Sequence, residues 1–104
     1  MQLRTKELDM ETKIQLRHPA GKKAISMDIE KYNSIKNAVL QCLNSKGEST
    51  HAEILQAITE DFKQNQILFE GSVEWHMEWV KLDMEAKKEI IRIDDKPPVK
   101  FKLA

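Results

Sequence analysis

Lysine and arginine side chains, the residues of this sequence that could bind phosphate, concentrate near its two ends. Residues 1–27 carry six Lys/Arg against three acids, residues 90–104 carry four against two, and residues 28–89 carry seven against twelve. The formal net charge of the 104 residues is zero, which argues against a strong overall attraction to nucleic acid. The two basic ends could still contact phosphates, and the expected contacts are Arg17, Lys22, Lys23, Arg92, Lys96, Lys100 and Lys102.

The tetrapeptide at residues 20–23, AGKK, contains the Gly-Lys pair of a nucleotide phosphate loop without the rest of that motif. A phosphate loop needs a glycine five residues before the pair and Ser or Thr after it. Leu16 and Lys23 hold those two positions. We therefore interpret the segment as a turn with solvated lysines, which could still contact phosphate together with Arg17 and His18.

Neither a metal site nor a catalytic set stands out. His18, His51 and His76 are isolated, and none has a second ligand four residues away to place two metal-binding side chains on one helix face. We expect His51 to be exposed in the first turn of a helix. No Ser/His/Asp or Cys/His set stands out either, so we expect no metal, no cofactor and no enzymatic activity.

Acidic residues gather on the third expected helix, where a carboxylate pair could in principle do acid–base chemistry. Glu74, Glu78 and Glu85 are spaced along the polar flanks of that helix. Lys81 and Lys88 can pair with Glu78 and Glu85 at three- or four-residue spacing. We interpret these acids as a solvated, ion-paired flank.

The only cysteine, Cys42, cannot form an internal disulfide, and its apolar helical surroundings indicate a small buried side chain. Residues 1–7 lack the apolar core of a signal peptide, and the apolar runs are too short to span a bilayer. We therefore expect a cytoplasmic protein with one domain over residues 1–104. It would comprise an N-terminal arm (1–27) and a helical core with a wing (28–104).

Near the N-terminus, apolar residues alternate with polar ones and turn-forming residues follow. Ile14 and Leu16 alternate with polar residues, and the turn-forming residues 18–21 (HPAG) follow. This pattern predicts a short hairpin or an extended arm over residues 13–27. Residues 1–11 show no clean period and could be helix, arm or disordered chain.

Capping residues divide the middle of the chain into three helices. Asp28 is expected to cap the first helix, which Gly47 ends, and Thr50 with Glu53 forms a capping box for the second. The loop at residues 65–71 contains Ile67, Leu68 and Phe69, and we expect all three to be packed because exposing them together is costly. Ser72 is expected to cap the third helix.

The third helix, expected from Gly71 to Ile90, carries two apolar stripes on opposite sides. Val73, Met77, Val80 and Met84 form one stripe, and Trp75, Trp79, Leu82 and Ala86 form the other. A surface helix needs only one apolar face, so the second stripe should be covered by something else. The N-terminal segment of the same chain could cover it, or the stripe could be an interface with a second copy or another protein. The third possibility is that it stacks against the bases of a nucleic acid.

The last elements are two expected strands. Ile91 and Ile93 alternate with polar residues, Pro97-Pro98 follows in a turn, and apolar and lysine residues then alternate from Val99 to Leu103. Three helices followed by such a hairpin are typical of a winged helix, with the second and third helices as the helix-turn-helix pair. The expected fold is therefore α+β, a winged helix with an N-terminal extended arm or hairpin; a helical bundle with an attached hairpin is the alternative.

Four short motifs support that fold by resemblance. They are His18-Pro19-x-Gly21-Lys22, Met27-Asp28-x-x-Lys31-Tyr32, Gly71-Ser72-Val73-x-Trp75 and Val80-Lys81-Leu82-Asp83-x-Glu85-Ala86. Over residues 14–94 the chain resembles a family of small uncharacterised bacterial proteins thought to have a winged-helix fold. The resemblance implies the fold and no activity. Lys87-Lys88 departs from it, because a small residue or glycine is expected where the third helix ends.

Two functions remain open at this point. The chain could be a DNA-binding winged-helix protein, such as a small dimeric regulator, that contacts phosphates through its basic arm and wing. Against this, the third helix is acidic where bases would be read, and only cytosine favours an acidic side chain. The alternative is a non-catalytic interaction or dimerisation module whose interface is Trp75, Trp79, Leu82 and Ala86.

Overall fold

Two short strands, β1 (Lys13–Gln15) and β2 (Ser26–Asp28), come first in the computed structural model, which describes residues 12–104. They pair antiparallel with Ile14 opposite Met27, which confirms the hairpin form of the expected arm. Leu16 and Met27 are buried, so the hairpin is anchored to the helical core. The alternatives left open for residues 1–11 lie outside the described residues.

Each helix has the N-terminal cap that the sequence predicts. Asp28 accepts a hydrogen bond from the backbone N–H of Lys31 at 3.2 Å and caps α2 (Ile29–Lys46). Thr50 and Glu53 form the expected capping box of α3 (His51–Gln64): the N–H of Glu53 bonds to the hydroxyl of Thr50 at 3.1 Å, and the N–H of Thr50 bonds to the carboxylate of Glu53 at 2.8 Å. Ser72 caps α4 (Val73–Ala86) through a 3.0 Å bond from the N–H of Trp75. Local side-chain to backbone bonds therefore set all three starts.

Helix α4 is shorter than the expected 71–90. It ends at Ala86, and Lys88 adopts a left-handed conformation with φ of 63°. The N–H of Lys88 bonds to the carbonyl of Glu85 at 3.0 Å and the N–H of Glu89 bonds to that of Met84 at 2.8 Å, which is the Schellman pattern. The chain thus turns out of the helix at the position where a glycine was expected.

The C-terminal hairpin is confirmed and belongs to a larger sheet. Strands β4 (Ile90–Ile93) and β5 (Lys100–Leu103) pair antiparallel with Ile91 opposite Lys102. The two-residue strand β3 (Ser49–Thr50) pairs with β5 on its other side, in the order β3-β5-β4. The sequence did not predict β3. Residues 12–104 therefore form an α+β fold with three helices and a C-terminal hairpin, which is compatible with a winged helix.

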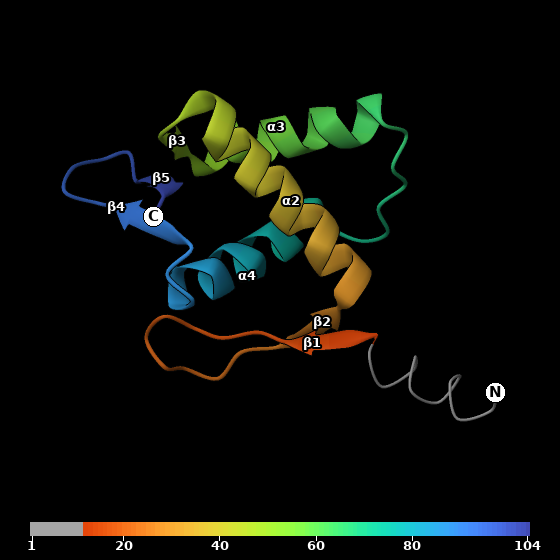
Figure 1. Ribbon diagram of the computed structural model, residues 1–104, viewed down its shortest axis with the longest axis horizontal. Helices are drawn as coiled ribbons and strands as arrows, with labels where there is room; N and C mark the ends of the chain where they lie inside the picture. The colour runs from red at the N-terminus through yellow and green to blue at the C-terminus, as the bar shows by residue number, and fades with distance from the viewer. Residues whose placement is uncertain (1–11) are drawn as a thin grey trace.

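Helix α2 crosses α3 and α4 and carries much of the core (Figure 1). The first stripe of α4 faces this core, because Met77, Val80 and Met84 are completely buried. Cys42 is buried on α2, as predicted. The β1–β2 hairpin runs alongside α4, and the hairpin of β4 and β5, which we call the wing, lies beyond the C-terminal end of α4 (Figure 1). Helix α4 thus packs against α2, with the hairpin and the wing beside it, and keeps one face exposed.

The loop between α3 and α4 departs from expectation. Leu68 is 96% exposed and Ile67 is 39% exposed, so the prediction that Ile67, Leu68 and Phe69 are all packed was wrong. Only Phe69 covers the core, stacked on Phe62 with 5.5 Å between ring centroids. Because the segment is not helical, neighbouring side chains point in different directions, and the packing of Phe69 leaves Leu68 in solvent.

Candidate functional site

Three of the predicted phosphate contacts lie in the loop between β1 and β2. Arg17, Lys22 and Lys23 are exposed there, and a hollow of about 520 Å³ separates the two arms of the loop. A tight turn shapes the loop, in which the N–H of Gly21 bonds to the carbonyl of His18 at 2.9 Å. Gly21 has φ of 75°, so glycine suits this turn. The lysines are therefore displayed on a backbone turn, as the sequence predicts.

The predicted contacts of the wing differ in their surroundings. Lys96 and Lys102 are exposed, whereas Lys100 is half-buried. Arg92 binds Glu85 of α4 through its Nε at 3.1 Å and its Nη2 at 3.4 Å. These bonds to Glu85, the larger cause, and nearby carboxylates raise the pKa of Arg92. Arg92 is consequently paired within the chain, which weakens its case as a phosphate contact.

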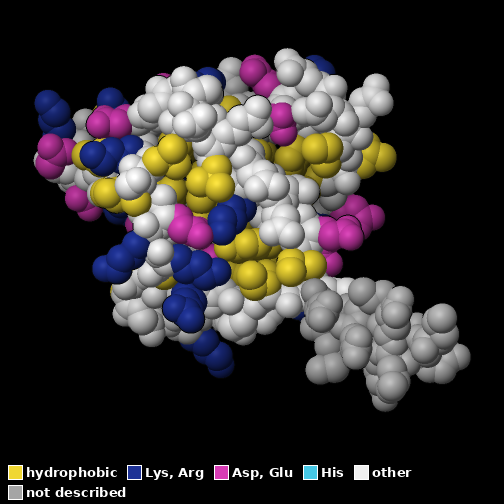
Figure 2. Space-filling model, in the orientation of Figure 1, with side chains coloured by type: hydrophobic (Ala, Val, Ile, Leu, Met, Phe, Trp, Pro, Cys, Tyr) yellow, Lys and Arg dark blue, Asp and Glu magenta, His cyan; other side chains and the backbone are white. Residues whose placement is uncertain are grey.

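The hairpin loop and the end of α4 meet at one end of the molecule. Pro19 of the loop lines a common hollow with Lys88, which follows α4, and Arg92 of β4. Lys and Arg side chains gather over this region in Figure 2, below the wing tip. We call Arg17, Lys22, Lys23 and Lys88 the basic edge; all four are exposed. The structure thus places the basic loop beside the end of α4.

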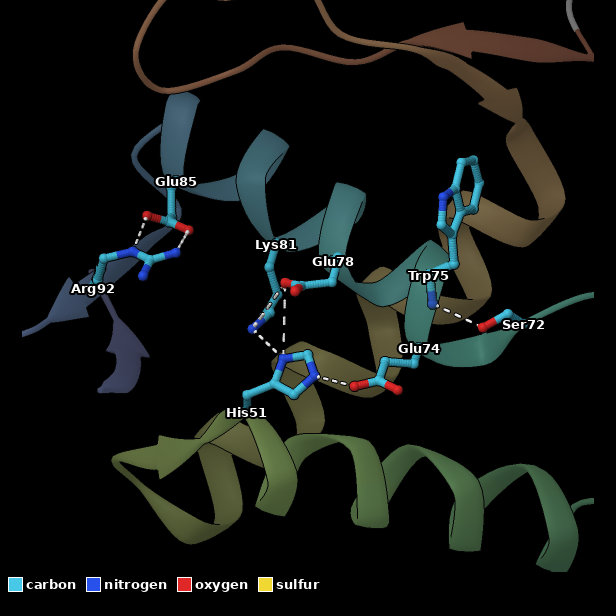
Figure 3. Close-up of polar contacts among 8 residues, drawn as sticks. All are labelled: His51, Ser72, Glu74, Trp75, Glu78, Lys81, Glu85 and Arg92. Carbon is cyan, nitrogen blue, oxygen red and sulfur yellow. Dashed lines mark hydrogen bonds and ion pairs between the residues drawn. The ribbon is translucent and has the colours of Figure 1, made fainter. Parts of the chain in front are cut away.

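A polar cluster joins α3 and α4 at the other end of α4 (Figure 3). His51, in the first turn of α3, lies 2.8 Å from Glu74 through Nε2 and 2.8 Å from the Nζ of Lys81 through Nδ1. Glu78 lies 3.7 Å from Lys81 and 3.8 Å from His51. The Lys81–Glu78 pair was predicted, whereas Glu85 pairs with Arg92 and not with Lys88. His51 is half-buried by these contacts, so its predicted exposure was wrong.

Lys81 is the unusual member of this cluster, because its side chain is only 3% exposed. Its Nζ lies 3.9 Å from the centre of the Phe101 ring, a cation–π contact between α4 and β5. Burial lowers the pKa of Lys81 to about 8, and Glu78 opposes that shift. A lysine ammonium only donates hydrogen bonds, so Nδ1 of His51 accepts and its Nε2 donates to Glu74. The cluster ties α3, α4 and the wing together.

Asp83 is a second buried charge, and the sequence did not predict its burial. It is completely buried and accepts bonds from the hydroxyl of Tyr32 at 2.6 Å and the backbone N–H of Arg17 at 2.8 Å. Lys87 pairs with it at 3.0 Å. Burial, followed by the bond to Asp83, raises the pKa of Tyr32. One carboxylate therefore fixes α2, α4 and the start of the hairpin loop together.

The second stripe of α4 is partly covered. Trp79 packs against the edge of the core, Leu82 and Ala86 are half-buried, and Trp75 is 49% exposed. The bond from Arg17 to Asp83 shows that the hairpin lies along this flank of α4. Trp75 points away from the polar cluster (Figure 3) and contacts the ring of His76 edge-on at 4.9 Å. Among the four predicted interface residues, Trp75 is thus the one that is exposed to solvent.

The described residues contain no group of three or more His, Cys, Asp or Glu side chains arranged to hold a metal ion. Within residues 12–104, no helix combines the length and the apolar character needed to cross a membrane.

Residues 13–101 match the model of a family of unknown function, DUF6958. No curated protein and no solved structure matches the chain.

Proposed function

The chain belongs to this family of unknown function, so its activity has to be argued from its own surface, and we propose that it binds duplex DNA through phosphate contacts. In this proposal the protein is a small, non-catalytic winged-helix protein of the bacterial cytoplasm, such as a transcriptional regulator. The basic edge and the exposed wing lysines, Lys96 and Lys102, supply the contacts. The observation that supports it is the gathering of Lys and Arg side chains over one end of the molecule (Figure 2).

The proposal excludes base reading by the outer face of α4. Glu74 and Glu78, each with a side chain 57% exposed, lie on that face. Carboxylates close to phosphates repel them, and few base edges compensate. The proposed binding is therefore driven by the phosphate backbone, with a strong salt dependence and a weak preference for sequence.

Fluorescence anisotropy with a labelled random duplex tests the proposal directly. Binding should be strongest at low salt and should weaken steeply as salt rises, because each phosphate contact releases counterions. The variant Lys22→Gln/Lys23→Gln should lower affinity by roughly tenfold and make the salt dependence shallower by about two contacts. The control, Lys63→Gln, removes an exposed lysine from the far end of α3 and should have little effect. No binding at low salt would contradict the proposal.

A second candidate function is self-association through α4, favoured by the half-exposed Trp75. Tryptophan is enriched at the energetic centres of interfaces because it buries a large area at little entropic cost. In this case Trp75→Ser should abolish a dimer seen in sedimentation velocity and leave the far-UV circular dichroism spectrum unchanged. A monomer at all concentrations would remove this candidate.

A further inference from the structure

The loop between α3 and α4 presents apolar side chains that the proposed DNA contacts do not use. Leu68 and Ile67 project from this loop, and a groove of about 550 Å³ lies between the loop and the first turns of α2. Phe69 lines the groove and is fixed by stacking on Phe62 and by an edge-on contact with His76. A rigid aromatic floor beside a fully exposed leucine is typical of a surface that receives a partner's apolar side chain.

Carboxylates surround this groove. Asp28, Glu30 and Glu70 line it, against a single cation, Lys31. The lysine lies over the ring of Phe69 at 5.5 Å, and Asp28 is used as the cap of α2. Glu30 and Glu70 are exposed at the rim. The groove therefore combines an apolar floor with a negative rim, at the end of the molecule opposite to the gathered Lys and Arg side chains (Figure 2).

We infer that this groove is a docking site for a basic amphipathic segment of another protein, whose apolar side chains meet Leu68 and Phe69 while its Lys or Arg side chains face Glu30 and Glu70. Charge complementarity determines this choice of partner. A second copy fits less well, because a two-fold contact would place the same acidic rim against itself. The inference is independent of DNA binding, which uses the other end of the molecule.

Two labelled helical peptides of about four turns test the inference by fluorescence anisotropy. Both carry leucine at the same positions along one face, and the other face is lysine in one peptide and glutamate in the other. The lysine peptide should bind at least tenfold more tightly than the glutamate peptide, because like charges at the rim repel. Equal binding of the two peptides would overturn the inference.

Leu68→Ser should weaken binding of the lysine peptide by tenfold or more, since it removes the most exposed apolar contact, and its exposure means that folding should not change. The control is Ile91→Ser, which removes a 44% exposed isoleucine from β4. It should leave the affinity unchanged. An equal loss in both variants, or none in Leu68→Ser, would show that the groove is not the binding site.

Three further measurements separate this inference from its alternatives. Lys22→Gln/Lys23→Gln, which should weaken DNA binding, should leave peptide binding intact, so that either proposal can fail alone. Glu30→Gln/Glu70→Gln should weaken binding of the lysine peptide and reduce the salt dependence of that binding. Sedimentation velocity of the protein without peptide gives the last outcome. A dimer that Leu68→Ser dissociates would assign the groove to a second copy and overturn the inference.

Discussion

At the residue scale, α4 buries two charged side chains only two positions apart and gives them different surroundings. The carboxylate of Asp83 receives hydrogen bonds from a hydroxyl and a backbone N–H, and a lysine pairs with it. The ammonium of Lys81 has an imidazole nitrogen and an aromatic ring close by, and its carboxylate partner is more distant. A buried charge with several hydrogen bonds holds the elements around it together. A buried charge with a distant partner has its pKa shifted so that the neutral form is favoured.

Replacing Asp83 should therefore be costly. Asp83→Asn removes one acceptor and leaves Lys87 and the hydroxyl of Tyr32 without a carboxylate, which should lower the free energy of unfolding by about 3 kcal/mol. Tyr32→Phe should cost about 2 kcal/mol because its bond is to a charged group. In urea unfolding, the double variant should lose less than the sum of the two, since both act on one network.

The control for this cycle is Glu60→Gln, which changes an exposed carboxylate of α3. It should change the free energy of unfolding by no more than about 0.5 kcal/mol. Equal effects of Asp83→Asn and Glu60→Gln would mean that the buried network adds little to stability.

Lys81 should make stability depend on pH in the alkaline range. Its pKa is about 8 in the folded chain, below the ordinary value of 10.5, so the unfolded chain holds more protons between these values. The free energy of unfolding should then rise with pH, by about 2 kcal/mol from pH 7 to pH 9.5. His51, Glu74, Glu78, Glu85 and Arg92 surround the amine and set the size of this effect.

The measurement is urea unfolding from pH 7 to pH 9.5 of the natural chain and of Lys81→Met, which keeps the length of the side chain. The free energy of unfolding of the natural chain should rise with pH relative to that of Lys81→Met. Above pH 10 the sign changes for another group, because the raised pKa of Tyr32 makes the unfolded chain lose its proton first. A pH-independent difference up to 9.5 would show that Lys81 stays protonated.

At the element scale, the helix starts and the end of α2 at Gly47 were predictable, whereas the end of α4 was not. Asp28, Thr50 and Ser72 act through bonds to residues three positions away, so the sequence contains both partners within one turn. The end of α4 was predicted four residues too late, because Lys88 adopts the left-handed conformation that usually marks a helix end only when the residue is glycine. Strand β3 was not predicted, because its partner β5 is about fifty residues away in the chain.

The left-handed conformation of Lys88 gives a prediction about stability. Lys88→Gly should raise the free energy of unfolding by about 0.5–1 kcal/mol, because glycine adopts this conformation without the clash of a Cβ atom. Lys88→Ala is the matched control, since it removes the charge and keeps the Cβ atom. Thermal unfolding should therefore place Lys88→Gly above the natural chain and Lys88→Ala level with it or below. A glycine variant less stable than the alanine variant would contradict this explanation.

At the scale of the whole molecule, a net charge of zero conceals two ends of opposite sign. The basic edge lies at the C-terminal end of α4, and the acidic groove lies beside the loop that precedes this helix. The unequal charge of the chain segments was visible in the sequence, and it predicted Arg17, Lys22 and Lys23 as exposed. The sequence did not show that Arg92 is paired with Glu85 or that Leu68 is exposed, because both depend on where distant elements pack.

This separation predicts how α4 would lie on DNA. About 20 Å separates Glu74 from Lys88 along the helix axis, well over the screening length of about 8 Å at physiological salt. If the basic edge makes the contacts, Glu74→Gln/Glu78→Gln should change DNA affinity by less than about twofold at 150 mM salt. At about 10 mM salt, where screening extends to about 30 Å, the same variant should bind more tightly.

Anisotropy at the two salt concentrations measures both effects, with the thermal midpoint of the variant as the check that glutamine preserves the contact to His51. A large gain in affinity at 150 mM salt would mean that the face of α4 lies close to phosphates. That outcome would move the interface from the basic edge to the helix itself, because only groups within a screening length of the backbone are felt at that salt concentration.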